Sequence, residues 1–465
     1  MIMAPSSLRP PPIYHNAKVL KKSPPKCFAW NTAYMDLPSM PKSARHKPRL
    51  AISTLGCKTN FYESAVIAQS FGDTELVDFN QEADIYVINT CTVTNRTDYK
   101  SRNLNRKALL RKAEQPHIRI VVTGCFAQRS FEEIRAMGDV DLIVDNQNKL
   151  DIAAILDGKD NVFTDIMDAK DFAYKQVSSM LGHTRAFQKI QDGCDFYCAY
   201  CAVPYARGHS RSAHYEDVIN QAQIFAESGF NEIVLGGVNL GLYCDGDRDI
   251  ADVVTGIAEI PAIELIRISS IEPQLLSKGL LQKLSTVDKL CPHFHIPLQS
   301  GCDSILKSMG RHYDTLLIER LITRIIDLYP DAAIGFDLIC GFPGESEEQY
   351  LQTYEFLNSL PIAYLHVFPY SRRKGTKADK MPGHLPNAIK KERVRCLSAL
   401  SNSKKQAYIE CLKKNNITLR GINEADDNAK AEILSDHYIR FQMPYPRPQG
   451  TLISCDINDG RVITD

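Results

Sequence analysis

The sequence has little tryptophan, no net charge and no long hydrophobic run. A single Trp stands in 465 residues, and Lys plus Arg equal Asp plus Glu at 55 each. A balanced charge does not indicate a nucleic-acid partner, so any basic surface has to be local. No stretch approaches the roughly 18–20 uninterrupted apolar residues of a membrane helix, and no membrane span is predicted.

Cysteine, in contrast, is abundant, with fourteen residues along the chain. Residues 1–48 are rich in proline and basic residues and lack the apolar segment of a secretory signal, so they are interpreted as a disordered tail or a mis-set start. A basic organelle transit peptide is the alternative there. Without a secretory signal, the cysteines favour metal ligation or redox chemistry in the reducing cytoplasm over a disulfide scaffold.

From about residue 49 the chain alternates short β-branched runs with helix-like segments. The first runs are RLAIST, DIYVINT, IRIVVTG and DLIVDN. Such runs are typical of buried parallel strands joined by crossover helices. We therefore expect an open, flavodoxin-like α/β domain over residues 49–155, followed by a linker at 156–185.

A second alternating series occupies residues 186–412. Its strand candidates are FQKIQDG, NEIVLGG, ELIRISS, HFHIPLQ, AAIGFDLI and AYLHVFPY, with room for a helix after each. Six such units predict a (β/α)6 partial barrel, in which functional groups gather at the carboxyl ends of the strands. A charged helical run then leads to a short β module at 413–465, so the fold class is α/β with a small β module at its end.

The strongest motif is CDFYCAYC, which places Cys194, Cys198 and Cys201 in the loop after the first barrel strand. Three thiolates in one loop can bind three irons of a 4Fe–4S cluster and leave the fourth iron open to another ligand. A structural zinc site would need a fourth protein ligand, for which His209 is the one nearby histidine. Coincidental spacing of buried cysteines is the remaining alternative.

Three further cysteines each follow a predicted strand of the first domain: Cys57 in TLGC, Cys91 in INTC and Cys125 in VTGC, at two equal intervals of 34 residues. Because ligands of an open α/β sheet bind beyond the carboxyl ends of its strands, these thiols are expected to meet and to hold a second cluster. The alternatives are buried structural cysteines and a flavin site, although a flavin phosphate does not need three thiols. The other cysteines are interpreted as packing or incidental residues: Cys27, Cys244, Cys291, Cys302, Cys340, Cys396, Cys411 and Cys455.

A C-x3-C-x2-C motif on the first strand of a six-unit βα series resembles the radical S-adenosylmethionine (radical SAM) superfamily. The resemblance implies that S-adenosylmethionine (SAM) chelates the open iron and that its reductive cleavage yields a 5′-deoxyadenosyl radical. It also implies cofactor contacts at the strand ends, although a lone Ser or Gln there often has a structural role. These contacts are Tyr200 near the adenine, Gly236, Gly237 and Asn239 of LGGVN near the methionine amino group, and Ser270, Glu272, Gln299, Gly341 and Glu345 near the ribose, carboxylate or adenine.

Two three-cysteine sites followed by a β module resemble the methylthiotransferases of this superfamily. The similar stretches are GCKTNFYES (56–64), NTCTVT (89–94), VTGCFAQ (122–128), CAVPYARGHSRS (201–212), HIPLQSGCDSILKSMGR (295–311) and HVFPYSRRKGT (366–376). The first and fourth, with KIQDGC, are most similar to the branch that acts on N6-threonylcarbamoyladenosine beside the tRNA anticodon. This implies insertion of a methylthio group at C2 of that base. The barrel cluster would make the radical, and the second cluster would deliver a sulfur methylated by a second SAM.

Other substrates remain open within the same chemistry, namely isopentenyl-adenosine in tRNA and an aspartate of a ribosomal protein. A non-catalytic iron–sulfur protein is disfavoured, because electron carriers normally close all four iron positions. No side chain beyond the cluster ligands is expected to be catalytic. The implied partners are the tRNA anticodon loop and an electron donor such as flavodoxin or ferredoxin, with no membrane.

Basic residues follow both ends of the predicted barrel: Arg207 and Arg211 after the cluster motif, and Arg372, Arg373 and Lys374 after the last strand. They are candidates for phosphate contacts, with a solvated basic loop as the alternative for each. The C-terminal module stands where relatives carry a small RNA-binding barrel called TRAM. Here it is short and poor in Lys and Arg, so we expect a degenerate TRAM-like module that mainly packs against the barrel.

Overall fold

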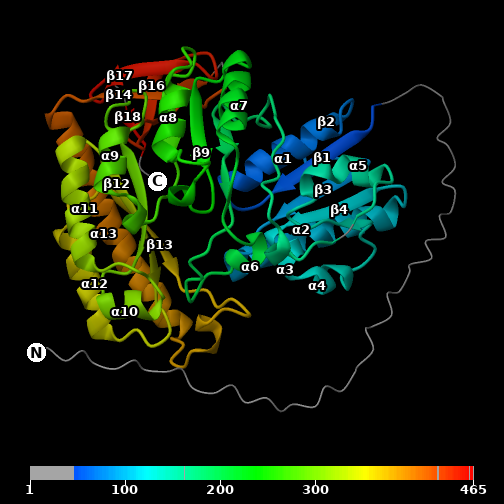
Figure 1. The fold of residues 1–465 in the computed structure, drawn as a ribbon, viewed down its shortest axis with the longest axis horizontal. Coiled ribbons are helices and arrows are strands. Elements are labelled where there is room, and N and C mark those ends of the chain that lie inside the picture. Colours follow the sequence, from blue (N-terminus) through cyan, green and yellow to red (C-terminus); the bar gives the residue numbers. More distant parts are fainter. Residues whose placement is uncertain (1–46, 162, 427–428, 460, 464–465) are drawn as a thin grey trace, which may run out of the picture. The chain divides into compact units, whose positions relative to one another are not determined.

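The computed structural model describes residues 47–161, 163–426, 429–459 and 461–463. The predictions for residues 1–46, including the tail and Cys27, lie outside the described residues. Two α/β parts and a β module follow one another along the described chain (Figure 1).

A parallel sheet with the order β2-β1-β3-β4-β5 forms the first part. Its strands are β1 (Arg49–Thr54), β2 (Glu75–Val77), β3 (Ile85–Thr90), β4 (Arg119–Gly124) and β5 (Leu142–Ile143). Its helices are α1 (Lys58–Ser70), α2 (Asn95–Glu114), α3 (Cys125–Arg129), α4 (Phe131–Arg135), η1 (Lys149–Asp151) and α5 (Ile152–Leu156). This is the strand order of flavodoxin-like sheets, so the predicted fold is confirmed. Strand β2 was not predicted, because three partly exposed residues give no periodic signal.

Burial on both faces explains the apolar runs of the central strands. Along β3, Val87 joins one hydrophobic cluster, while Tyr86 and Ile88 join another on the opposite face. Strand β4 divides its residues in the same way. A strand covered on both faces reads as a continuous hydrophobic run, which is the pattern in the sequence.

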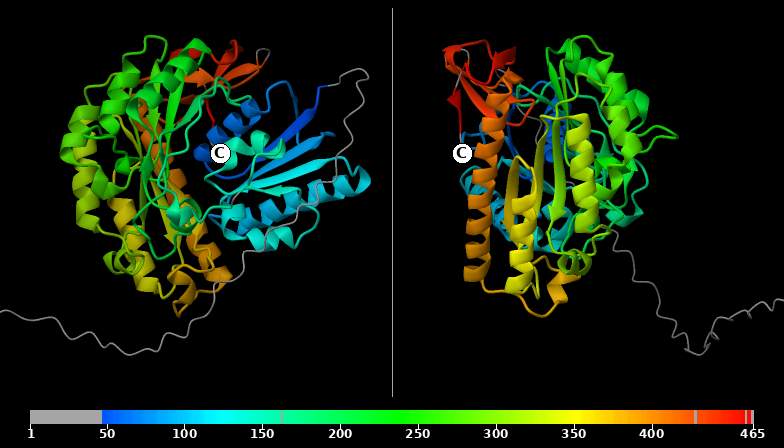
Figure 2. Two further views of the ribbon diagram at one scale, coloured as in Figure 1. Left: turned by 45° about the vertical axis from the view of Figure 1, so that its right-hand side comes forward. Right: turned by 90° about the vertical axis from the view of Figure 1, so that its left-hand side faces the viewer.

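Six parallel strands form the predicted partial barrel. They are β6 (Ala186–Lys189), β9 (Glu232–Gly236), β10 (Leu265–Ile268), β11 (His293–Gln299), β12 (Ala333–Cys340) and β13 (Tyr364–Pro369). The sheets β6-β9-β10 and β11-β12-β13 are joined by isolated parallel bridges, one of them between Ser270 and His295. The larger helices are α7 (Tyr215–Glu227), α8 (Ile250–Ala258), α9 (Lys278–Leu284), α11 (Thr315–Leu328), α12 (Glu347–Ser359) and α13 (Asn387–Lys414), the last of which runs along β13 (Figure 2).

Residues 156–185, predicted as a linker, begin with the last residue of α5 and otherwise contain one short 3-10 turn, η2 (Ile166–Asp168), among the described residues. The segment is bonded to both α/β parts. Tyr62 of α1 donates a 2.8 Å hydrogen bond to the carbonyl of Lys175. Gln221 of α7 exchanges two hydrogen bonds with the backbone of Val177, at 2.9 and 2.7 Å. Residues 175–177 of the connection are therefore fixed to both α/β parts.

The C-terminal strands form an antiparallel sheet in the order β17-β14-β15-β16-β18. They are β14 (Thr418–Asn423), β15 (Lys430–Ser435), β16 (Arg440–Pro446), β17 (Leu452–Asp456) and β18 (Arg461–Val462). Tyr438, in the turn between β15 and β16, stacks on His293 with ring centroids 4.3 Å apart. Arg267 of β10 donates to the carbonyl of Ser435 at 2.9 Å. The module is thus bonded to the barrel.

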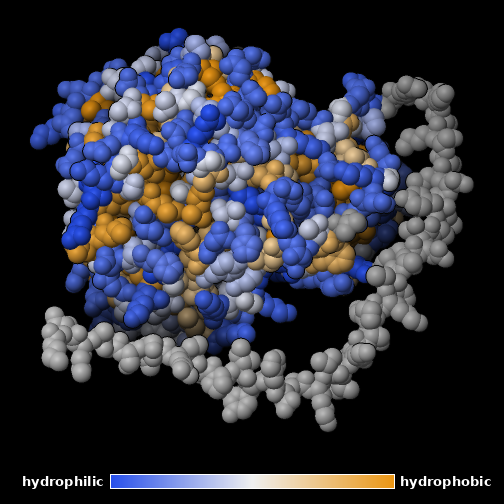
Figure 3. Space-filling model, in the orientation of Figure 1, coloured by the Kyte–Doolittle hydropathy of each residue, from blue (hydrophilic) through white to orange (hydrophobic). Residues whose placement is uncertain are grey.

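Hydrophilic side chains cover much of the molecular face shown in Figure 3, with hydrophobic side chains between them. In the part of the chain that the structure describes, every helix is too short or too polar to serve as a membrane span.

His437 stands between two carboxylates at the joint of barrel and module. Its Nδ1 lies 2.8 Å from Asp436 Oδ1, and its Nε2 lies 3.1 Å from Asp331 Oδ2. Burial alone would lower the pKa of His437, but hydrogen bonds to Asp331 and Asp436 and their charges raise the pKa to about 9.

We expect this joint to weaken in alkaline solution. The folded-state pKa of His437 lies above its ordinary value of 6.5, so its contribution is fully present below pH 6.5 and is lost as the pH rises through about 9. A shift of this size corresponds to at most roughly 3 kcal/mol. Thermal unfolding of wild type and His437→Gln at pH 6.5 and pH 9.5 should show a Tm difference at the lower pH that disappears at the higher. A difference that does not change with pH would contradict the assignment.

Candidate metal centre

The first cysteine triplet lies beyond three neighbouring strands. Cys57 precedes α1, Cys91 follows β3 directly, and Cys125 is the first residue of α3 after β4. Strands β1, β3 and β4 are adjacent in the sheet, so the three residues share one edge. Cys57 and Cys125 both act electrostatically on Cys91. The structure therefore brings together the three thiols that equal spacing predicts.

Glycines before two of these cysteines let the loops approach one another. Gly56 has φ +103°, and a Cβ there would lie 2.7 Å from both Cβ and Sγ of Cys91. Gly124 has φ +92°, and a Cβ there would lie 2.3 Å from the carbonyl oxygen of Thr90. A side chain at either position would separate the loops, which explains why TLGC and VTGC each carry glycine.

The second triplet, Cys194, Cys198 and Cys201, lies in the loop that follows β6 and the short strand β7 (Gln191–Asp192). Backbone hydrogen bonds fix this loop from two sides. The N–H of Ala199 donates to the carbonyl of Met309 at 2.7 Å, and the carbonyl of Ala199 accepts from Ala378 at 2.7 Å. The loop is therefore held by segments that follow β11 and β13.

Arg311 organises the barrel side of this triplet, and sequence reasoning assigned it no role. Its Nη1 donates to Cys198 Sγ at 3.2 Å, to Glu272 Oε1 at 3.0 Å and to Tyr200 Oη at 3.4 Å. A second nitrogen also bonds the Glu272 carboxylate, and both side chains are largely buried. Arg311 ends the stretch HIPLQSGCDSILKSMGR, so the family resemblance was the one sequence signal that could have found it.

Arg129 relates the two triplets to each other. Its guanidinium is close enough to interact electrostatically with both Cys125 and Cys201. It also donates a hydrogen bond to the carbonyl of Lys374, in the loop after β13. The sheet-edge triplet and the loop triplet thus approach the same arginine.

The donor atoms fit iron–sulfur clusters better than single zinc ions. A tetrahedral zinc with bonds of about 2.3 Å holds its sulfurs about 3.8 Å apart. Among the described residues, neither triplet has its three sulfurs within 4.8 Å of one another. Burial, and to a smaller extent the nearby Cys125, raises the pKa of Cys91 to about 12. Burial, and to a smaller extent the nearby Cys198, raises the pKa of Cys201 to about 12. Thiolate ligands at these positions need the positive charge of bound metal.

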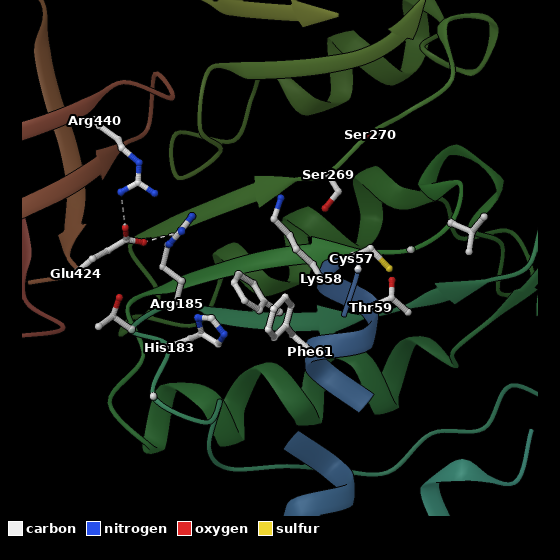
Figure 4. A pocket seen from close by; sticks show the side chains of 17 residues that line it. Cys57, Lys58, Thr59, Phe61, His183, Arg185, Ser269, Ser270, Glu424 and Arg440 are labelled. Atoms are coloured by element: carbon white, nitrogen blue, oxygen red, sulfur yellow. Dashed lines mark hydrogen bonds and ion pairs between the residues drawn. The ribbon is translucent and has the colours of Figure 1, made fainter. Parts of the chain in front are cut away.

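Some of the predicted cofactor residues line one cavity. Gly236, Gly237 and Ser270 border a space of about 660 Å³ that also contains Cys57 (Figure 4). Tyr200 and Glu272 lie instead around Arg311, as described above. Gln299 ends β11 at a register irregularity, with φ +71°.

Asn239 has the environment of a ligand-binding amide. It is 2% exposed and lies beside the Cys194 thiol. Apart from this thiol, which interacts with the amide as a hydrogen-bond partner, its side-chain polar atoms have no partner among the described residues. Its backbone N–H donates to Gln191 Oε1 at 2.8 Å, and Gln191 Nε2 donates to the carbonyl of Gly193 at 2.8 Å. Gln191, which sequence reasoning did not single out, therefore joins the LGGVN loop to the cluster loop.

The GFPGE turn is organised differently from the prediction. Glu345 is buried, accepts a hydrogen bond from the N–H of Gly341 at 2.7 Å and forms an ion pair with Arg393 of α13. Gly341 has φ +75°, and a Cβ there would lie 2.4 Å from Cγ of Lys390. In this structure Glu345 and Gly341 attach the turn to α13, and their predicted contact with the cofactor stays a prediction.

A buried ion cluster joins the first domain to the barrel. Glu63 of α1, 1% exposed, pairs with Lys149 of η1, with Lys189 of β6 at 2.9 Å and with Arg207 at 3.0 Å. Asp192 completes the cluster, 2.7 Å from Lys189 and 2.9 Å from Arg207. Burial would raise the pKa of Glu63, but Arg207, Lys149 and Lys189 hold it well below its usual range.

Three of the predicted RNA contacts are therefore wrong for this structure. Arg207, of helix α6 (Pro204–Arg207), is 2% exposed and is occupied by Glu63 and Asp192. Arg211 is 9% exposed and donates to the carbonyls of Arg207 and His209. Arg373 is 4% exposed, pairs with Asp98 at 2.7 Å and donates to the carbonyl of Thr92. These arginines hold the two domains and the cluster loop together.

Arg372 and Lys374 are placed differently, because both are exposed. The Arg372 side chain is 60% exposed and pairs with Asp379. Both residues border a cavity of about 960 Å³ with Arg129 and residues of α3 and α4. They remain open to a partner.

Two family models match the chain. The model of the radical SAM superfamily matches residues 189–357, and that of the uncharacterized protein family UPF0004 matches residues 49–145.

Characterised relatives span most of the chain. The threonylcarbamoyladenosine tRNA methylthiotransferase MtaB of Aquifex aeolicus (strain VF5) is 37% identical over 414 residues, 87% of this chain and 99% of the relative. The protein of the same name from Bacillus subtilis (strain 168) is 39% identical over 370 residues, 77% of this chain and 81% of the relative. The tRNA-2-methylthio-N(6)-dimethylallyladenosine synthase of Francisella tularensis subsp. novicida (strain U112) is 33% identical over 402 residues, 83% of this chain and 90% of the relative.

Among solved structures, the radical S-adenosylmethionine methyltransferase TsrM from Kitasatospora setae, with cobalamin and a [4Fe-4S] cluster bound, is similar with a TM-score of 0.55. The alignment covers 72% of this chain and 77% of that chain at 11% identity. At this identity the similarity concerns the fold alone.

The Glu63 carboxylate is predicted to be essential for the joint between the domains. In Glu63→Ala, three buried cations lose their shared partner, and removal of one member of a buried ion pair costs about 3–5 kcal/mol. Urea unfolding should show this loss, whereas Glu227→Ala, on the exposed face of α7, should change stability little. A loss below about 1 kcal/mol for Glu63→Ala would contradict the assigned role.

Proposed function

The chain belongs to the radical SAM methylthiotransferase family, and on this basis we propose that it replaces the C2 hydrogen of N6-threonylcarbamoyladenosine in tRNA with a methylthio group. Two relatives that carry this substrate in their names are 37% and 39% identical to the chain. The relative named for dimethylallyladenosine is 33% identical. The observation that carries the proposal is that each α/β domain gathers one cysteine triplet and that Asn146 bonds both Cys125 Sγ, at 3.9 Å, and the carbonyl of Ala206 in the segment after Cys201, at 2.6 Å.

The cofactors of this function are two 4Fe–4S clusters and SAM. Cys194, Cys198 and Cys201 would hold the cluster of the barrel, and the sheet-edge triplet would hold the other. When bound, these groups supply the radical and sulfur chemistry that an unreactive aromatic C–H bond requires. The described chain offers no acid, base or nucleophile suited to that bond. Its own residues therefore bind and orient the reactants and exclude side reactions.

Buried polar residues carry out this positioning. Arg311, fixed by Glu272, holds the thiol of Cys198 in place. Gln191 sets the distance between the LGGVN loop and the cluster loop. The amide of Asn239, whose side chain has no partner among the described residues other than the Cys194 thiol, is our candidate for a direct contact with SAM, since buried polar groups are normally satisfied by hydrogen bonds.

The tRNA is proposed to approach the side of the loop after β13. Arg372 and Lys374 would contact phosphates there. Phe368 of β13 and Tyr205 of α6 are exposed by 45% and 37%, and exposed aromatic rings can stack on unpaired bases of an RNA loop. The target base would have to leave its stack to reach the site between the domains.

The reaction also implies a further partner and a compartment. An electron donor such as flavodoxin or ferredoxin would supply the reducing electron. We place the reaction in the cytoplasm, where tRNA is available and free thiols persist.

Reconstitution gives the direct test. Protein reconstituted anaerobically with iron and sulfide should, with dithionite, SAM and bulk tRNA, form 2-methylthio-N6-threonylcarbamoyladenosine, as measured by nucleoside mass spectrometry. Cys198→Ala should abolish deoxyadenosine formation, while Cys91→Ala should retain part of it and lose thiolation. The exposed, unassigned Cys244→Ala serves as control. Deoxyadenosine without the expected nucleoside would refute the substrate, and thiolation by Cys91→Ala would refute the second cluster.

The exposed basic pair should contribute to tRNA affinity. Because each phosphate contact adds close to one to the salt slope, Arg372→Gln with Lys374→Gln should reduce the slope of log K against log salt by about 1–2. Fluorescence anisotropy with labelled tRNA between 50 and 200 mM salt measures it, with Arg395→Gln on the exposed side of α13 as the matched control. An unchanged slope would show that this surface does not contact the phosphates of tRNA. Arg373→Gln, in contrast, should lower stability.

A further inference from the structure

The cavity beside Cys57 carries an unbalanced positive charge. Its charged lining residues are Lys58, Arg185, Arg440 and Glu424. Arg185 lies 2.6 Å and Arg440 3.2 Å from the carboxylate of Glu424, and each has a second acid, Glu232 at 4.0 Å and Glu432 at 3.1 Å, so both arginines are paired. For the Lys58 ammonium, no hydrogen-bond or ion-pair partner exists among the described residues. The cavity is therefore suited to an anion.

Lys58 is placed at the sheet-edge triplet by the backbone itself. It follows Cys57 in sequence and is the first residue of α1. Figure 4 shows its side chain extending into the cavity, between Cys57 and the ion pairs of Glu424. The carboxylate of Glu232 attracts the Lys58 ammonium, but this carboxylate is bonded to Arg267 at 2.9 Å. The charges of Arg267 and Arg185 repel Lys58. Among the described residues, no carboxylate forms an ion pair with this lysine.

The proposed substrate carries an anion at a suitable place. Its N6 substituent is a threonine attached through a urea, and it ends in a free carboxylate. N6 is attached to C6, which is separated from C2 by the single ring atom N1. A site that delivers sulfur to C2 from the triplet of Cys57 therefore has this substituent close by. The dimethylallyl group, in contrast, is apolar and uncharged.

We propose that Lys58 binds the carboxylate of the N6-threonylcarbamoyl group and thereby selects this base over adenosines with a neutral N6 substituent. The inference rests on the proposed function. The anionic group forms a charge-assisted hydrogen bond with Lys58, whereas a neutral group leaves the desolvated ammonium without a partner. The hydrogen bond therefore favours the threonylcarbamoyl base, and the cost of the unpaired ammonium disfavours bases with a neutral substituent.

An aromatic wall completes the cavity. The ring centroids of Phe61 and His183 are 5.0 Å apart, and those of His183 and Phe187 are also 5.0 Å apart. All three line the same space as Lys58. Such rings offer an apolar surface for a purine or for the threonine methyl group, next to a single cation for the carboxylate.

A paired-ligand experiment tests the inference. Two anticodon stem-loops, one with the N6-threonylcarbamoyl carboxylate and one with its primary amide, are titrated into anaerobically reconstituted protein. Wild type should bind the acid about 10- to 100-fold more tightly than the amide, as expected for a hydrogen bond between charged groups. Lys58→Gln and Lys58→Met should bind both stem-loops alike, near the affinity of wild type for the amide. Lys58→Arg should keep a preference, and Lys391→Gln, an exposed lysine of α13, should resemble wild type.

If Lys58 binds a different anion, the same experiment gives different results. Equal weakening of both stem-loops by Lys58→Gln would assign the lysine to a phosphate and overturn the proposal. If Lys58→Gln keeps the preference for the acid but binds SAM more weakly, as read from deoxyadenosine formation without RNA, the lysine contacts SAM. That result would also overturn the proposal. If wild type thiolates the acid stem-loop but binds the amide equally well, the role of Lys58 fails while the function stands. If wild type thiolates no such stem-loop, the proposed function itself fails.

Discussion

The charge balance around Glu63 is the constraint on which the relation between the two domains depends. One buried carboxylate of the first domain binds cations from η1, β6 and α6, so neither domain can move alone without uncovering a charge. Arg207 also donates to Asn60 Oδ1 at 2.5 Å, and Asn60 Nδ2 bonds the carbonyls of Leu55 and Thr90 at the loops of Cys57 and Cys91. The same network therefore aligns the domains and shapes the first metal site.

The two triplets differ in how they arise from the sequence. Cys194, Cys198 and Cys201 lie within eight residues, and one loop is enough to gather them. Cys57, Cys91 and Cys125 come together only because β1, β3 and β4 are neighbours in the sheet. The second arrangement needs the whole domain to fold first.

Much of the fold was predictable, since buried parallel strands and strand-end cysteines leave local patterns. Every strand expected in the barrel is present, and only the short, partly exposed β2 was missed in the first sheet. The site was predicted less completely, because charge pairing depends on partners distant in sequence. A basic residue near a cluster motif, such as Arg207, looks the same whether it faces RNA or a buried carboxylate. Glu63, 144 residues away, decides between these possibilities.

The connection at 156–185 has a consequence for access. Because it is bonded to Tyr62 on one side and to Gln221 on the other, it acts as a strap across the same joint that the ion cluster closes. Hinge opening would have to break the strap and the salt bridges at once. On the proposed function, entry of a large RNA would therefore depend on a small, extruded part of it reaching the space between the domains rather than on separation of the domains.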